Sequence, residues 1–136
     1  MEVRKIRAEM RNGRSFYDMP LRVTFYARVS TDQDEQINSL ENQVQYYTEL
    51  IQSRPNWRFV PGYVDEGISG GSTKKRDNFN RMIRDAKAGM FDFIVTKEIS
   101  RFSRNTLDSI QYTQELLDCG VAVLFQNDNI NTLDGD

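Results

Sequence analysis

Short apolar runs alternate with helix-forming segments along most of this chain, and that alternation constrains the fold more than any other feature. Four apolar runs predict strands, at residues 21–29, 57–65, 91–96 and 121–125. The segments between them carry apolar residues at spacings of three and four, which predicts helices. A repeated strand–helix order favours an α/β fold in which a mostly parallel sheet of four to five strands is flanked by helices.

The helices and one strand carry more specific signals. Asn38 and Glu41 form a capping-box pattern at the start of the first helix, and the second helix, residues 78–87, stops at Gly89. Pro61-Gly62 predicts an irregularity within the second strand. The residues expected to face the core are Leu40, Val44, Tyr47 and Ile51 in the first helix, Phe79, Met82, Ile83 and Ala86 in the second, and Leu107, Ile110 and Leu117 in the third.

The length of 136 residues suits one folded domain, which we expect to span residues 21–128. Residues 1–20 carry five basic side chains and no apolar stretch, so we expect a flexible or partner-binding extension there. Residues 129–136 show no core-forming pattern and predict the start of a linker. No apolar run in the sequence approaches the roughly 20 residues of a membrane span.

Two residue types are scarce, and their scarcity limits the chemistry. The chain has no histidine, which excludes a Ser-His-Asp triad and histidine-ligated metal sites. Its single cysteine, Cys119, excludes an internal disulfide and a thiolate zinc cluster within the chain. We therefore expect no metal and no cofactor. The net charge of −2 argues against strong nucleic-acid binding by this segment alone.

Polar side chains gather where the first three predicted strands end. Because the carboxyl ends of parallel strands meet at one edge of a sheet, we expect one shared site. Arginine binds phosphate through a fixed fork of donors, and phosphoryl transfer depends on neutralising charge on the phosphate oxygens. Several arginines beside a serine therefore predict attack by a hydroxyl on a phosphodiester without a metal ion. These residues are Arg28, Ser30, Asp65, Ser69, Lys97, Arg101 and Arg104.

Three stretches of the sequence resemble the motifs of the serine recombinases, the resolvase/invertase family. Tyr26-Ala27-Arg28-Val29-Ser30 resembles the N-terminal signature of that family. Residues 63–70, YVDEGISG, are similar to its second motif, and residues 97–105, KEISRFSRN, to its third. The motifs occur in the family's order, and the resemblance covers residues 21–128. It implies a resolvase catalytic-domain fold and the activity of a site-specific DNA recombinase.

The resemblance also implies a role for each site residue. Ser30 would attack a DNA phosphodiester and form a 5′-phosphoserine link, leaving a free 3′-hydroxyl, while Arg28 would hold the scissile phosphate. Many resolvases carry an aspartate where this chain has Ser100, so the general acid and base stay open. The further catalytic positions would be Arg76, Arg101, Arg104 and Gln43, and the supporting positions Tyr26, Asp65, Ser69 and Ser100.

The third motif and the basic extension look most like the large serine recombinases of integrase or transposase type. Such a protein would act on double-stranded DNA recombination sites and associate with itself into dimers and tetramers. It would work in the cytoplasm of a bacterium, encoded by the host, a phage or another mobile element. The DNA-binding regions of that class would follow Asp136, so we expect the isolated domain to be inactive alone.

Two other functions remain open from the sequence. A non-catalytic, flavodoxin-like phosphate- or nucleotide-binding domain would share the layered fold. However, the chain has no glycine-rich phosphate-loop motif, and Gly67, Gly70 and Gly71 follow the second strand. A serine hydrolase would need another way to activate its serine, because no histidine is present.

Overall fold

Six strands form the sheet at the centre of the molecule. The computed structural model describes residues 3–30, 40–67, 76–97 and 106–134. Within these ranges the strand order is β2-β1-β4-β5-β6, and β3 continues from β2 along the same edge of β1. Neighbouring strands are parallel except for β5 and β6, which confirms the predicted mostly parallel sheet. The strands are β1 Arg22–Ser30, β2 Arg58–Phe59, β3 Tyr63–Gly67, β4 Phe93–Thr96, β5 Ala122–Phe125 and β6 Ile130–Asn131.

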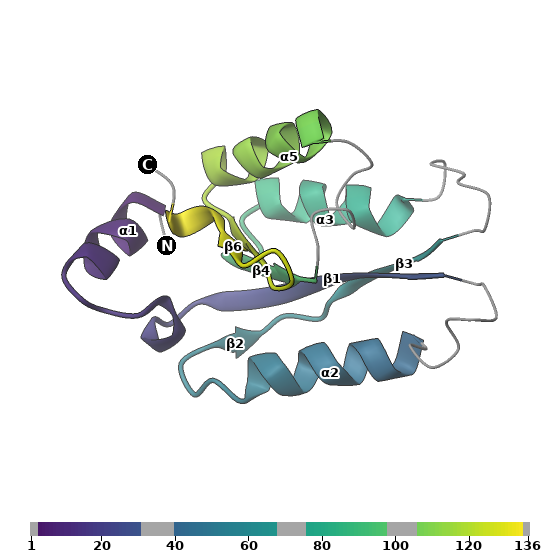
Figure 1. Ribbon diagram of the computed structural model, residues 1–136, viewed down its shortest axis with the longest axis horizontal. Helices are drawn as coiled ribbons and strands as arrows, with labels where there is room; N and C mark the ends of the chain where they lie inside the picture. The colour runs from purple at the N-terminus through teal and green to yellow at the C-terminus, as the bar shows by residue number, and fades with distance from the viewer. Residues whose placement is uncertain (1–2, 31–39, 68–75, 98–105, 135–136) are drawn as a thin grey trace.

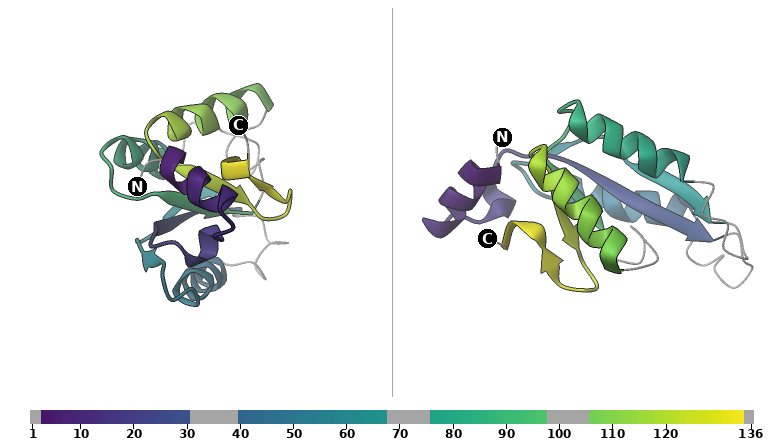
Figure 2. Two further views of the ribbon diagram at one scale, coloured as in Figure 1. Left: turned by 90° about the vertical axis from the view of Figure 1, so that its left-hand side faces the viewer. Right: turned by 90° about the horizontal axis from the view of Figure 1, so that it is seen from above.

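Helices cover both faces of this sheet (Figure 1). α2 packs on one face, and α3 and α5 lie side by side on the other, as the view from above in Figure 2 also shows. None of the helices in the described ranges is long and apolar enough to cross a membrane. The helices are α1 Val3–Arg11, α2 Leu40–Gln52, α3 Asp77–Lys87 and α5 Thr106–Asp118, with 3₁₀ turns η1 Phe16–Asp18 and η3 Thr132–Asp134.

Two apolar cores lie on the two faces of the sheet. Side chains alternate along β1, so that Phe25 faces the core under α2, and Tyr26 faces the core under α3 and α5. All four residues of β4 are buried, as expected for a central parallel strand covered on both faces. The cap residue predicted for α2, Asn38, lies outside the described residues. The predicted inward residues of α2 and α3 that are buried are Tyr47, Ile51, Phe79, Met82, Ile83 and Ala86.

The strand predicted at residues 57–65 is divided into β2 and β3 at the predicted irregularity. Val23 of β1 pairs with Phe59, and Tyr26 pairs with Tyr63, so the partner strand has one more residue than β1 between the two pairs. Such an insertion is a β-bulge, which bends a strand and increases its local twist. The bulge sets the direction in which β3 runs toward the carboxyl end of β1 (Figure 1).

Gly62 is required at this bulge because of the ring beside it. A Cβ at this position would lie 2.2 Å from the Phe25 ring. That ring is buried and stacks on Tyr47 with centroids 4.9 Å apart, so it has little room to move aside. The Thr24 hydroxyl also ties β1 to the bulge, since it donates to the Pro61 carbonyl at 3.1 Å.

The inward face of α5 differs from the prediction. Leu107 and Ile110, which we expected in the core, are 66% and 57% exposed. The inward line of the helix runs instead through Ser109 and Leu116, which are buried and lie two turns apart. Leu117 is partly buried, as predicted. The first turns of α5 therefore present an apolar edge outward.

Both ends of the described chain pack at the same end of the sheet. α1 buries Val3 and Ile6 in the core that lies under α2, so it is a docked helix where we expected a flexible extension. Arg7 donates from Nε and Nη2 to the carbonyls of Leu133 and Thr132, at 3.2 and 2.9 Å. β6 and η3 pack on the sheet where we expected a linker to start, and Leu133 is buried.

Candidate active site

The carboxyl ends of the parallel strands β1, β3 and β4 lie at one edge of the sheet, as predicted. Arg28 of β1 is paired with Asp65 of β3, and the backbone of Ser30 is paired with that of Gly67, where both strands end. Lys97 follows the last residue of β4 directly. The sheet therefore brings residues from three distant parts of the sequence to the same edge.

Asp65 links the elements at this edge. It is 4% exposed, and its carboxylate accepts three hydrogen bonds. The Tyr26 hydroxyl donates to Oδ2 at 2.9 Å. The backbone N–H groups of Asn78 and Phe79 donate to Oδ1 and Oδ2, each at 3.0 Å. One buried carboxylate thus joins β1, β3 and the first turn of α3.

The contact with α3 is a helix cap supplied from a distant strand. The N-cap position of α3 is Arg76, whose own side chain makes no capping hydrogen bond. A carboxylate at this place satisfies free amides of the first turn and interacts favourably with the helix dipole. Asn78 adds a second tie to β3, because its Nδ2 donates to the Val64 carbonyl at 2.7 Å. These bonds fix the start of α3, and with it the backbone of Arg76.

The side chain of Arg76 is oriented by an aromatic ring. Its guanidinium carbon lies 3.9 Å from the centroid of the Phe79 ring, in a cation–π contact. The Tyr26 ring meets the same Phe79 ring edge-on, with centroids 5.2 Å apart. The half-buried guanidinium is therefore held next to the Tyr26–Asp65 pair.

The pKa of the Tyr26 hydroxyl is raised, first because the side chain is buried and second because it lies beside the Asp65 carboxylate. The charge and hydrogen bond of Arg76 act in the opposite direction and are weaker. Tyr26 therefore remains a neutral phenol at physiological pH. It serves as a hydrogen-bond donor to Asp65 and not as a base.

The structure describes some of the remaining predicted site residues in full, one by its backbone alone, and others not at all. Arg28 is half-buried near the end of β1, and Gln43 is half-buried near the start of α2. For Ser30 the structure describes the backbone, as the last residue of β1. The predicted site residues outside the described part of the chain are Ser69, Ser100, Arg101 and Arg104.

Sequence reasoning missed two supports of this edge. One is the first turn of α3, where Asn78 and Phe79 anchor Asp65. The other is Thr96, whose hydroxyl donates to the Tyr26 carbonyl at 2.9 Å and ties β4 to β1 beside the site. A threonine that closes an otherwise apolar strand was the available signal for the second support.

The arrangement is suited to holding an anion. Arg28, Arg76 and Lys97 supply positive charge at or near the edge, while the Asp65 carboxylate is already saturated with donors from the protein. Guanidinium groups held in this way can neutralise the charge of a phosphodiester and orient it. Within the described ranges, no group of histidine, cysteine, aspartate and glutamate is arranged to hold a metal ion.

Comparison with solved structures defines the class of protein. The structure is similar to the N-terminal catalytic domain of TP901-1 integrase, with a TM-score of 0.69 and 24% identity over 84% of each chain. It is also similar to a resolvase family site-specific recombinase from Streptococcus pneumoniae, with a TM-score of 0.68 and 30% identity over 85% of this chain and 78% of that one. The C-terminal catalytic domain of ISC1926 TnpA, an IS607-like serine recombinase, has a TM-score of 0.62 and 21% identity over 77% of this chain and 70% of that chain. The fold is that of serine recombinase catalytic domains.

Sequence comparison identifies the family. The model of the resolvase N-terminal domain matches residues 23–136. A Pseudomonas putida protein described as a resolvase/recombinase is 34% identical over 115 residues, which are 82% of this chain and 55% of that protein. The chain thus spans about half the length of this relative. It belongs to the resolvase family, as its three motifs predicted.

Proposed function

We propose that this chain is the catalytic domain of a site-specific DNA recombinase in which Ser30 is the nucleophile. The observation that carries the proposal is the cluster around Asp65, which holds Tyr26 and the α3 turn bearing Arg76 at the edge where β1 ends at Ser30. Family membership supports it, because the similar Streptococcus pneumoniae protein is described as a site-specific recombinase.

In the proposed reaction, the Ser30 Oγ attacks the phosphorus of a DNA phosphodiester. A bond forms between Oγ and phosphorus, and the bond from phosphorus to the 3′-oxygen breaks. The serine hydroxyl loses its proton, and the leaving 3′-oxygen takes one up, so the step is balanced. The strand is then held as a 5′-phosphoserine. Attack by a 3′-hydroxyl on that linkage reverses the bond changes and rejoins DNA.

The arginines replace a metal ion in this scheme. Arg28 and Arg76 neutralise the non-bridging oxygens as charge redistributes during the displacement, and two arginines of the third motif, Arg101 and Arg104, share that task. Asp65 is a positioning residue that acts through Tyr26 and the start of α3. The remaining proposed contributors are Gln43, Ser69 and Ser100.

Double-stranded DNA is the proposed substrate, and further copies of the same chain are the proposed partners. The outward apolar edge of α5, formed by Leu107 and Ile110, supports self-association, because such side chains gain free energy when a partner covers them. The similarity to an integrase and to a TnpA protein supports a role in moving DNA segments. The similarity to a Pseudomonas putida protein supports the cytoplasm of a bacterium as the place where the chain acts.

Trapping of a covalent intermediate tests the proposal. We expect the full-length protein to form a covalent complex with a nicked suicide substrate through Ser30. Ser30→Ala should abolish that complex and leave DNA binding intact, because it removes the nucleophile and no phosphate contact. A covalent complex formed by the alanine variant would place the nucleophile elsewhere and overturn the proposal.

Arginine variants test the charge-neutralising role in the same assay. Arg76→Lys should slow cleavage by about 10²-fold or more, because lysine keeps the charge but loses the planar fork. Arg58→Lys is the matched control, since Arg58 is exposed on β2 at the opposite end of β1. Arg54 is less suitable as a control, because its guanidinium carbon lies 3.9 Å from the centroid of the Tyr17 ring. Equal cleavage rates for Arg76→Lys and Arg58→Lys would contradict the role of Arg76.

A further inference from the structure

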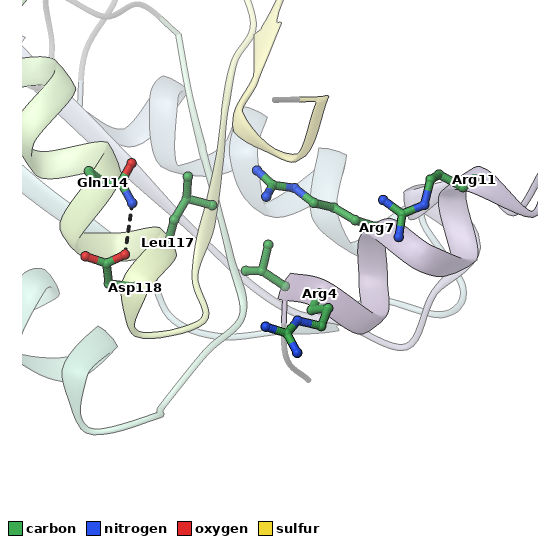
Figure 3. A pocket seen from close by; sticks show the side chains of 7 residues that line it. Arg4, Arg7, Arg11, Gln114, Leu117 and Asp118 are labelled. Carbon is green, nitrogen blue, oxygen red and sulfur yellow. Dashed lines mark hydrogen bonds between the residues drawn. The ribbon is translucent and has the colours of Figure 1, made fainter. Parts of the chain in front are cut away.

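A row of arginines on α1 faces a groove far from the candidate active site. Arg4, Arg7 and Arg11 lie on successive turns of this nine-residue helix and line a groove of about 450 Å³ between α1 and α5. Figure 3 shows the three side chains on one wall and Gln114, Leu117 and Asp118 on the other. We call Arg4, Arg7 and Arg11 the arginine row.

The charge of the arginine row is poorly compensated within the described part of the chain. Arg4 and Arg11 are exposed, and neither forms an ion pair there. The acid on α1, Glu9, is already paired with Arg14 at 2.7 Å. Asp118, which accepts a hydrogen bond from Gln114 at 2.9 Å, is the one carboxylate among the described residues that line the groove, so three arginines face a single acid there. Like charges three and four residues apart destabilise a helix by a few tenths of a kcal/mol per pair, a cost that a bound anion removes.

The arginine row is also held in a fixed orientation. Val3 and Ile6 anchor α1 in the core, and Arg7 donates to the carbonyls of Leu133 and Thr132. This clamp fixes the rotation of the helix about its axis, so Arg4 and Arg11 project beside Arg7 toward the groove. Binding an anion there requires little reordering of the backbone, which favours affinity.

We propose that the two exposed members of the arginine row, Arg4 and Arg11, bind the phosphate backbone of DNA, as a contact separate from the catalytic one, while Arg7 holds the helix in place. From Arg4 to Arg11 the helix rises about 10 Å, which matches two to three successive phosphates of one strand. Arginine, with its bidentate fork, suits phosphate better than lysine. α1 and the end of β1 at Ser30 lie at opposite ends of the molecule (Figure 1), so the row meets DNA away from the scissile phosphate.

This inference rests on the proposed function, since it assumes that DNA is the substrate. Its experiment measures binding by this 136-residue chain to a short fluorescein-labelled DNA duplex of arbitrary sequence, by anisotropy, between about 50 and 200 mM salt. For Arg4→Gln/Arg11→Gln we expect weaker binding. The slope of the logarithm of the association constant against the logarithm of the salt concentration should become less negative by about two. Arg4→Lys/Arg11→Lys should keep the slope, and Arg58→Gln is the matched control.

Several results would overturn the inference. One is an unchanged salt slope in the double glutamine variant, and another is the same loss of slope in Arg58→Gln. Absence of measurable DNA binding by the unmodified chain at the lowest salt would also count against it. If the double variant lost binding to polyglutamate but kept its DNA affinity, the groove would be a site for an acidic protein segment. Failure of Ser30 trapping would leave these binding results unchanged, so the two proposals fail separately.

Discussion

At the residue scale, Asp65 matters to the site mainly through the three hydrogen bonds that its carboxylate accepts. It receives hydrogen bonds from a phenol hydroxyl of β1 and from two backbone amides of α3, and each of these donors would lose its acceptor if the carboxylate were removed. A buried donor without an acceptor costs about 1–3 kcal/mol. Asp65 therefore supports both the stability of the domain and the position of Arg76.

We expect Asp65→Asn to lower the free energy of unfolding by about 1–3 kcal/mol. The side-chain NH₂ group of the new asparagine is a donor, and it would face protein groups that are themselves donors. Tyr26→Phe should cost less, about 1 kcal/mol, because it removes one of the three bonds. Urea unfolding followed by circular dichroism measures both. Asp134→Asn, exposed in η3, is the control and should be near neutral. Unfolding of Asp65→Asn at the same urea concentration as the unmodified protein would show that the cap contributes nothing.

At the scale of elements, the bulge between β2 and β3 depends on the contact of Gly62 with Phe25. Gly62→Ala places a methyl group against a ring that is stacked on Tyr47, and overpacking of this kind costs about 1–3 kcal/mol. In a Phe25→Ala background the same substitution should cost much less, because the obstructing ring is gone. A double-mutant cycle by urea unfolding measures the coupling. If the losses in unfolding free energy of Gly62→Ala and Phe25→Ala were additive, the Phe25 ring would not be the cause of the Gly62→Ala loss.

A second link between elements is sensitive to pH. Asp92, just before β4, accepts bonds from the backbone N–H and Nε of Arg22 at 2.9 and 3.1 Å, and from Nη2 at 3.1 Å. Burial raises the pKa of Asp92, but hydrogen bonds from the Arg22 side chain and backbone lower it, and the net pKa lies below the ordinary carboxyl value. The link therefore contributes stability above about pH 4, which is lost as the pH falls through the folded-state pKa.

Asp92→Asn should accordingly be less stable than the unmodified protein at pH 7, and the difference should shrink as the pH falls below about 4. Parallel urea titrations at pH 7 and in acid measure this difference. Asp134→Asn should show no such convergence, because Asp134 is exposed. A difference that stays constant down to the lowest pH would rule out ionisation of Asp92 as the source.

At the scale of the whole molecule, α1 joins the two ends of the described chain. Ile6 is 1% exposed, and Ile-to-Ala changes in cores cost about 2–5 kcal/mol. We expect Ile6→Ala to release α1, so that amide exchange quickens in α1 and in residues 130–134 together while β4 stays protected. Leu107→Ala, at an exposed position, should leave both segments unchanged. Faster exchange in α1 alone would show that Arg7 does not couple the two ends.

The strands β1, β4 and β5 could be predicted from the sequence because they are covered on both faces and therefore have apolar runs. The prediction was wrong for Leu107 and Ile110, because helical spacing shows only that residues share one face of a helix. It does not show that another part of the chain covers that face. α1 and β6 are short and were missed because they depend on distant contacts. For example, the Val123 backbone N–H donates to the Thr132 hydroxyl.

The candidate site was predictable in part, for a similar reason. Its strand-end residues could be placed because parallel topology decides where strand ends meet, and the positions of Arg28 and Asp65 follow from that rule. The cap on α3 could not be predicted. Sequence rules search for a capping side chain next to the helix, whereas here Asp65 reaches it from another strand.

The cap on α3 also bears on the reversibility of the proposed reaction. Two first-turn amides of the helix are saturated by the protein's own carboxylate, so a substrate phosphate does not meet them as a rigid peptide cradle. A rigid cradle favours one location of the phosphorus atom over all others. A guanidinium such as that of Arg28 carries several donors, so it can bind the phosphoryl group both when that group is part of DNA and when it is linked to serine. The site would then stabilise the phosphoryl group about equally well in strand breakage and in strand joining. A recombination reaction needs both directions, because it must end with intact DNA.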